Sequence, residues 1–291
     1  MKKNTRLQKS PIRKRNEVKK HEQGRKNRLG IGITAGILLI AVLIGLIASG
    51  YLYAFGPFGF MADKRFAKMP GNAKEYALEN VQPLENSVLK GKKLAFLGSS
   101  VTLGASSLHT SFADYIAVRA GAEYVKEAVS GTTLADRGTN SYIARMEKMD
   151  KNARFDLFVV QLSTNDATKK TDLGKVSGRG KEHDAKTVCG AIEYIIDYAE
   201  KTWNCPVVFY TNAYFESEEY AAMVQALKQI QEQYGIGVID LYTDKEFNDI
   251  SEEERDLYMA DKIHPTRAGY LKWWTPKMEE YLNAFMTNIA A

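Results

Sequence analysis

From about residue 92 onward, short apolar runs alternate with longer amphipathic stretches. The apolar runs have the length and the bounding turn residues of strands, and they occur at 93–98, 123–129, 156–162, 206–211 and 236–241. The amphipathic stretches predict helices near 111–121, 186–202 and 217–234, with a last one after Thr266. Such alternation indicates parallel strands joined by right-handed crossovers, so we expect an α/β fold, a three-layer α/β/α sandwich with a parallel sheet.

The N-terminal part of the chain has a different pattern. No residue from Leu29 to Ala62 is charged, and 31–47 is dominated by Ile, Leu, Val, Ala and Gly. About 20 apolar residues are enough to cross a bilayer as a helix, so the sequence predicts one N-terminal transmembrane helix. A cleaved signal peptide is the alternative, but its apolar core is usually about 7–15 residues and follows a shorter basic lead.

Charge supports the same interpretation. Residues 1–28 hold twelve Lys or Arg against two Glu, whereas the whole chain of 291 residues is only +5, so the remainder is net acidic. A basic tail can bind nucleic acid, but one that directly precedes an apolar span marks the cytoplasmic side of a membrane, and we expect no nucleic-acid partner. The C-terminal part is then extracytoplasmic, on a single-pass protein of the cell membrane.

These observations divide the chain into four parts. We expect a basic cytoplasmic tail at 1–28, a transmembrane helix at 29–55, a stalk or linker at 56–90 and a catalytic domain at 91–291. The stalk is polar, with Pro70 and Pro83 as breaks.

The two cysteines fit an exported protein that does not depend on disulfides. Cys189 and Cys205 lie near opposite ends of the helix predicted at 186–202, about 18 Å apart along its axis, whereas a disulfide needs Cα atoms within about 7 Å. We expect two buried thiols and no metal site, because no second Cys or His stands at ligand spacing.

The run Leu94 to Thr102 is the first candidate for chemistry. A buried strand breaks abruptly into Gly98 and two serines, and the crevice beyond the carboxyl ends of parallel strands is where ligands bind in open α/β sheets. A Gly/Ser turn that only caps the next helix has the same sequence, so further residues must decide.

Two later stretches supply those residues. Asn165 follows the strand at 156–162 and can aim its amide at a developing oxyanion, although an Asn there can also merely cap a turn. Asp261 precedes His264 by three residues, close enough for a carboxylate to orient the imidazole. A serine hydroxyl needs such a base, because it is a weak nucleophile at its ordinary pKa.

Together these motifs resemble the SGNH hydrolases, or GDSL-like lipase/esterase family, over residues 92–283. The resemblance rests on four blocks in order: Gly98–Val101, Ala128–Leu134, Ser163–Asp166 and Asp261–His264. It implies a flavodoxin-like fold that needs no cofactor.

The same resemblance implies a role for each matched residue. Ser100 would be the nucleophile and His264 the general base, with Asp261 beside it. The backbones of Ser100 and Gly131 and the side chain of Asn165 would form the oxyanion hole. Ser99 and Ser163 depart from the family's usual Asp and Gly, and we expect them to alter the nucleophile turn and to narrow the pocket, respectively.

The remaining histidine and tryptophan residues are weaker candidates for a functional role. His109 has no carboxylate at short spacing and is at best a substrate contact, and His183 in a charged loop is expected to be solvated. Trp273 and Trp274 are expected in the core.

The sequence therefore predicts a membrane-anchored extracytoplasmic serine esterase that cleaves carboxylic esters by a Ser-His-Asp mechanism. Ester-bearing carbohydrates or lipids of the cell envelope are the expected substrates. An acyltransferase that uses the same site, or a non-catalytic glycan-binding module, is the alternative.

Overall fold

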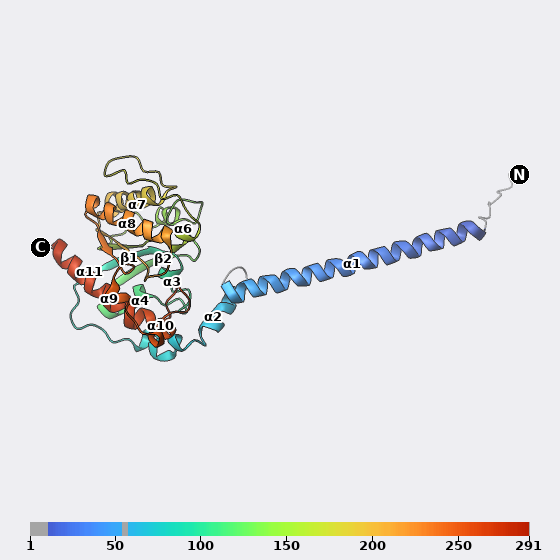
Figure 1. The fold of residues 1–291 in the computed structure, drawn as a ribbon, viewed down its shortest axis with the longest axis horizontal. Helices are drawn as coiled ribbons and strands as arrows, with labels where there is room; N and C mark the ends of the chain where they lie inside the picture. Colours follow the sequence, from blue (N-terminus) through green and yellow to red (C-terminus); the bar gives the residue numbers. More distant parts are fainter. Residues whose placement is uncertain (1–10, 54–57, 291) are drawn as a thin grey trace. The chain divides into compact units, whose positions relative to one another are not determined.

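The computed structural model describes residues 11–53 and 58–290 (Figure 1). The chain divides into two compact units, Met1–Lys64 and Arg65–Ala291. The first holds helix α1 (Pro11–Tyr53) and the short helix α2, whose bounds Phe60–Phe66 cross into the second unit. Within α1, Thr34–Tyr51 has a mean hydropathy of 2.2 and only 6% of it is buried, so this stretch is long and apolar enough to cross a membrane.

The second unit is built on a parallel sheet of five strands in the order β2-β1-β3-β4-β5. The strands are β1 (Lys93–Gly98), β2 (Glu123–Ala128), β3 (Leu157–Gln161), β4 (Val207–Tyr210) and β5 (Gly237–Ile239). All five lie within or beside the ranges predicted from the apolar runs. This order is the doubly wound, flavodoxin-like one, and its switch point falls between β1 and β3.

Successive side chains of a strand point to opposite faces of the sheet, and each face has its own hydrophobic core. Ala95 and Leu97 of β1 belong to one core, and Leu94 and Phe96 belong to the other, as the two-residue period of a strand requires. Helices α7 (Val188–Trp203) and α8 (Glu218–Tyr234) cover the first face (Figure 1). Helices α4 (Phe112–Ala120) and α11 (Thr275–Ala290) cover the second. The three-layer α/β/α fold is thereby confirmed.

The remaining elements are short, and two of them, α3 (Ser100–Leu103) and α6 (Thr164–Thr168), directly follow strands. The others are α5 (Tyr142–Met146), α9 (Lys245–Asn248), α10 (Glu252–Tyr258), the π-helix η4 (Gly269–Trp274), and the 3-10 turns η1 (Pro70–Asn72), η2 (Lys74–Tyr76) and η3 (Leu78–Asn80). Helices of four to seven residues carry too few apolar repeats for the sequence pattern to predict them.

Residues 65–90, part of the expected stalk, belong to the second unit. Asn72 is buried, and its amide donates to the carbonyls of Phe66 and Ser106 while its oxygen accepts from the backbone of Arg267. Leu89 is fully buried in the core that α4 and α11 cover. These contacts fix the segment against the domain.

The expectations for several core residues are confirmed. Cys189 and Cys205 are buried free thiols, and burial raises the pKa of both, to about 11 and about 12. Trp273 and Trp274 lie in the core.

Candidate active site

The carboxyl end of β1 presents Ser100 at the switch point of the sheet. Gly98 is required there, because a Cβ at this position would lie 1.7 Å from Thr102 Oγ1. Ser99 and Ser100 are neighbours with different surroundings. Ser99 is completely buried, whereas Ser100 is 8% exposed and its hydroxyl points to His264. The structure therefore presents Ser100, and not Ser99, to the crevice.

Ser100, His264 and Asp261 form one chain of hydrogen bonds. Ser100 Oγ lies 2.7 Å from His264 Nε2, and His264 Nδ1 lies 2.9 Å from Asp261 Oδ2 and 3.0 Å from Oδ1. An ionised carboxylate only accepts, so the hydrogen-bonded Nδ1 carries a proton, and in the neutral ring Nε2 accepts from the serine hydroxyl. That is the proton arrangement a hydroxyl nucleophile needs.

Asp261 is held ready by its own loop. Its Oδ1 accepts from the backbone N–H groups of Ile263 and His264, at 2.8 and 2.9 Å. Partial burial acts to raise the pKa of Asp261, but the donors from the imidazole and the backbone outweigh it, so the pKa lies below its usual value. The carboxylate therefore stays charged beside the imidazole.

Gly131 and Asn165 lie in two segments that contact each other. Asn165 Nδ2 donates to the carbonyl of Thr132 at 3.0 Å, and the carbonyl of Gly131 accepts from Lys169 Nζ at 2.8 Å. Gly131 has φ of +77°, a left-handed conformation that glycine adopts without strain. Gly131 and Asn165 thus lie beyond the carboxyl ends of β2 and β3, the two strands that flank β1.

Asp166 ties these two segments together beneath the surface. It is fully buried, and its carboxylate accepts from the backbone N–H groups of Leu134 and Ala135, at 2.7 and 3.3 Å. Burial raises the pKa of Asp166 in spite of these donors. Ser163 is buried, and its hydroxyl accepts from Asp166 N as the cap of α6.

Two residues that the sequence analysis missed support the turn around Ser100. Gln161, the last residue of β3, accepts with Oε1 from Ser99 N at 2.9 Å and from Thr102 Oγ1 at 2.8 Å. Arg145 is buried, and its guanidinium donates to the carbonyls of Gly98 and Glu127, at 2.7 and 2.9 Å. Neither residue lies in one of the four motifs. Each supports the turn from another element, Gln161 from β3 and Arg145 from α5.

His109 and His183 lie in other segments of the domain. His109 is exposed, with φ of +61°, in the loop between α3 and α4. The expectation that His183 is solvated is wrong: its side chain is 5% exposed, and its nitrogens lie 2.8 Å from Ser177 Oγ and 2.8 Å from Asp197 Oδ2. A charged sequence around a residue does not report how its loop folds back on a helix.

Within the described ranges, no group of three or more His, Cys, Asp or Glu side chains could hold a metal ion.

Comparison with known proteins assigns the chain to a family. Residues 96–272 match the model of the GDSL-like Lipase/Acylhydrolase family. No curated protein sequence matches the chain significantly.

Solved structures share the fold at low sequence identity. A protein from Lactobacillus plantarum is 20% identical with a TM-score of 0.57, over 67% of this chain and 98% of that one. A protein named as a GDSL-like lipase from Bacteroides ovatus is 19% identical with a TM-score of 0.51, over 67% and 99%. One named as a lipolytic protein of the G-D-S-L family from Desulfitobacterium hafniense is 15% identical with a TM-score of 0.52, over 66% and 99%.

Proposed function

Because the chain belongs to the GDSL-like lipase/acylhydrolase family, and is thereby an ester hydrolase, we propose that it cleaves carboxylic esters with Ser100 as the nucleophile and His264 as the general base. The observation that carries the proposal is the unbroken chain Ser100 Oγ, His264 Nε2, His264 Nδ1 and Asp261, with both contacts at hydrogen-bond distance. Asp261 orients the ring and stabilises its charged form.

The reaction follows from these positions. Ser100 Oγ attacks the carbonyl carbon of the ester and gives its proton to His264 Nε2, and His264 then returns that proton to the departing alcohol. Water attacks the acyl-enzyme in the second half, with His264 again accepting a proton and Ser100 leaving as the hydroxyl.

Negative charge develops on the carbonyl oxygen in both halves. The backbone N–H groups of Ser100 and Gly131 and the side chain of Asn165 are the proposed donors. One N–H of the Asn165 side-chain amide donates to the Thr132 carbonyl, and the second N–H can donate to the carbonyl oxygen of the substrate.

We further propose that the domain works outside the cytoplasm on an ester of the cell envelope. The apolar span Thr34–Tyr51 and the twelve basic residues before it support an anchor with the N-terminus inside.

Hydrolysis of p-nitrophenyl acetate tests the activity and the nucleophile. Ser100→Ala should lower kcat to near background, since the triad acts as a unit, whereas Ser99→Ala should retain measurable turnover because Ser99 faces the core. A fluorophosphonate probe followed by peptide mapping should label Ser100.

Labelling at Ser99 would contradict the assignment of the nucleophile. No hydrolysis by the intact protein, together with no labelling, would favour the non-catalytic alternative.

A further inference from the structure

Two hollows that share Tyr214 lie among the segments that follow β4 and β5, at the sheet edge that also carries Ser100. One part, about 760 Å³, is lined by Tyr214 and by residues 242–246 and 248–249. An adjoining part, about 620 Å³, is lined by 214–216, 255–256 and 259–262, and so includes Asp261. Tyr214 lines both parts, and we refer to the two together as the Tyr214 groove. Each part has the size of a small-molecule site.

The topology connects this groove to the catalytic centre. Its walls come from the segments that follow β4 and β5, and the carboxyl ends of parallel strands share one edge. Asn212, just after β4, donates from Nδ2 to the carbonyl of Ile263, the residue before His264. A molecule whose ester lies at Ser100 can therefore extend along this edge into the groove.

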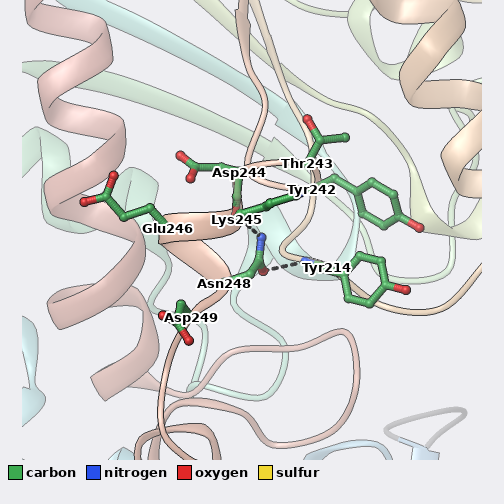
Figure 2. A pocket seen from close by; sticks show the side chains of 8 residues that line it. All are labelled: Tyr214, Tyr242, Thr243, Asp244, Lys245, Glu246, Asn248 and Asp249. Atoms are coloured by element: carbon green, nitrogen blue, oxygen red, sulfur yellow. Dashed lines mark hydrogen bonds between the residues drawn. The ribbon is translucent and has the colours of Figure 1, made fainter.

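Tyr214 is an exposed aromatic side chain on a fixed backbone. It is 56% exposed, and its ring centroid lies 5.3 Å from that of Tyr242, which is buried and whose hydroxyl donates to the Phe215 carbonyl. Asn248 accepts from Tyr214 N at 2.9 Å and donates to the Leu241 carbonyl at 2.7 Å. Figure 2 shows the two tyrosine rings on one side of Asn248 and the carboxylates of Asp244 and Glu246 on the other. A flat ring held in this way costs little entropy when it binds a ligand.

The charge of the lining restricts the ligand. The groove is lined by six Asp or Glu side chains against three Lys or Arg. The exposed wall of both parts is mostly apolar, and of the six carboxylates Asp244 pairs with Lys277 and Asp261 with His264. An anionic headgroup would be repelled by the acidic lining, and a wholly apolar chain would remove water from the carboxylates that have no such partner. A neutral polyhydroxylated molecule suits both features, because its hydroxyls donate to carboxylates and its C–H face packs on the negative face of an aromatic ring.

We infer that the Tyr214 groove binds the alcohol part of the substrate, and that this part is a neutral glycan. The inference rests on the proposed esterase function and makes its substrate class definite, a glycan ester rather than a lipid ester. Tyr214 is then the residue on which a sugar ring stacks.

The test compares two esters in the full-length protein in detergent, acetylated xylohexaose and p-nitrophenyl acetate. Tyr214→Ala should raise KM for acetylated xylohexaose about five- to tenfold more than KM for p-nitrophenyl acetate, whose alcohol part has no sugar ring to stack. Tyr214→Phe keeps the ring and should behave as the intact protein does. Tyr194→Ala makes the same truncation on α7 and should leave the ratio of the two activities unchanged.

A binding measurement separates failure of this inference from failure of the proposed function. Xylohexaose titrated calorimetrically into the Ser100→Ala protein should bind, and the additional change Tyr214→Ala should weaken that binding by the same five- to tenfold. Binding without any ester hydrolysis by the intact protein would uphold the groove and refute the esterase.

Three results would overturn the inference. The first is equal losses on both esters in Tyr214→Ala. The second is no binding of xylohexaose. The third is a selective loss on p-nitrophenyl palmitate, which would make the groove an acyl site.

Discussion

Ser99 and Ser100 are adjacent in the sequence, but their surroundings in the structure are different. Ser99 hydrogen-bonds Gln161 in the interior, while Ser100 begins α3 with its hydroxyl 2.7 Å from His264 Nε2. A tight turn presents only one of two neighbouring residues to the crevice, and the position in the family's first motif indicated Ser100. The partner that holds Ser99 inward lies 62 residues later in the chain, where no local pattern could indicate it.

At this scale, Ser100 and His264 should behave as one unit. Ser100→Ala and His264→Ala should each abolish nearly all kcat on p-nitrophenyl acetate, and the double variant should be little worse than either. Asp261→Asn should cost less, because this carboxylate orients the ring without exchanging a proton. Near-full kcat in His264→Ala, with loss in His109→Ala, would show that the base is misassigned.

Asn165 should affect the rate and not the binding. Removing one oxyanion donor typically lowers kcat by about 10²–10³-fold, so Asn165→Ala should do so with little change in KM. Steady-state kinetics on p-nitrophenyl acetate measure both. Thr168→Ala, on the same short helix with its hydroxyl bonded to the Thr164 carbonyl, is the control and should keep kcat within severalfold.

A rise in KM without a fall in kcat would remove Asn165 from the proposed oxyanion hole. In the structure its amide already holds the Thr132 carbonyl, so a purely structural role would instead lower stability.

Among the elements, helix α7 fixes the long segment that precedes it. Glu193 is buried, and it accepts from Gly178 N at 2.7 Å and from Ser177 N and Oγ at 3.0 and 2.7 Å. Burial acts to raise the pKa of Glu193, but these donors outweigh it and the pKa is lowered. His183 completes the cluster between Ser177 and Asp197. A sequence that looks like a solvated loop is thus pinned to a helix.

This contact predicts a pH-dependent stability. A carboxyl whose folded pKa is lowered stabilises the fold above its ordinary value near 4.3, and that stabilisation is lost as the pH falls through the folded pKa. Glu193→Gln should therefore cost about 1–3 kcal/mol at pH near 7, and the difference from wild type should shrink as the pH falls below about 4. Urea denaturation at several pH values measures it.

Glu200→Gln is the matched control on the same helix. Glu200 pairs with Arg179 on the surface, where an ion pair contributes about 1 kcal/mol or less. A cost of Glu193→Gln that does not change with pH would show that the charge is not what matters.

For the whole molecule, the anchor predicts a topology. In intact cells or spheroplasts, added protease should degrade the domain at 63–291 and spare residues 1–28, because positive charge precedes the apolar span. Epitope tags at the two ends, read by immunoblot, give the result. A protected domain would reverse the orientation, and a mature N-terminus near residue 50 would identify a cleaved signal peptide.

The sequence by itself determined the sheet, the apolar span and the candidate triad. Buried parallel strands have continuous apolar runs in the sequence, which made them predictable. Asp261 and His264 are close enough in the sequence for one loop to hold both. The carboxyl ends of parallel strands share one edge of the sheet, so motifs that follow different strands were expected to lie together there.

Only the tertiary structure decided how that edge is supported and what lies along it. Gln161, Arg145 and Asp166 hold the site through buried hydrogen bonds to other elements, and Tyr214 lines a groove shared by three separate segments. Such contacts depend on distances in space between residues far apart in the chain. Local periodicity carries no information on those distances, because it reports only which face of an element is buried.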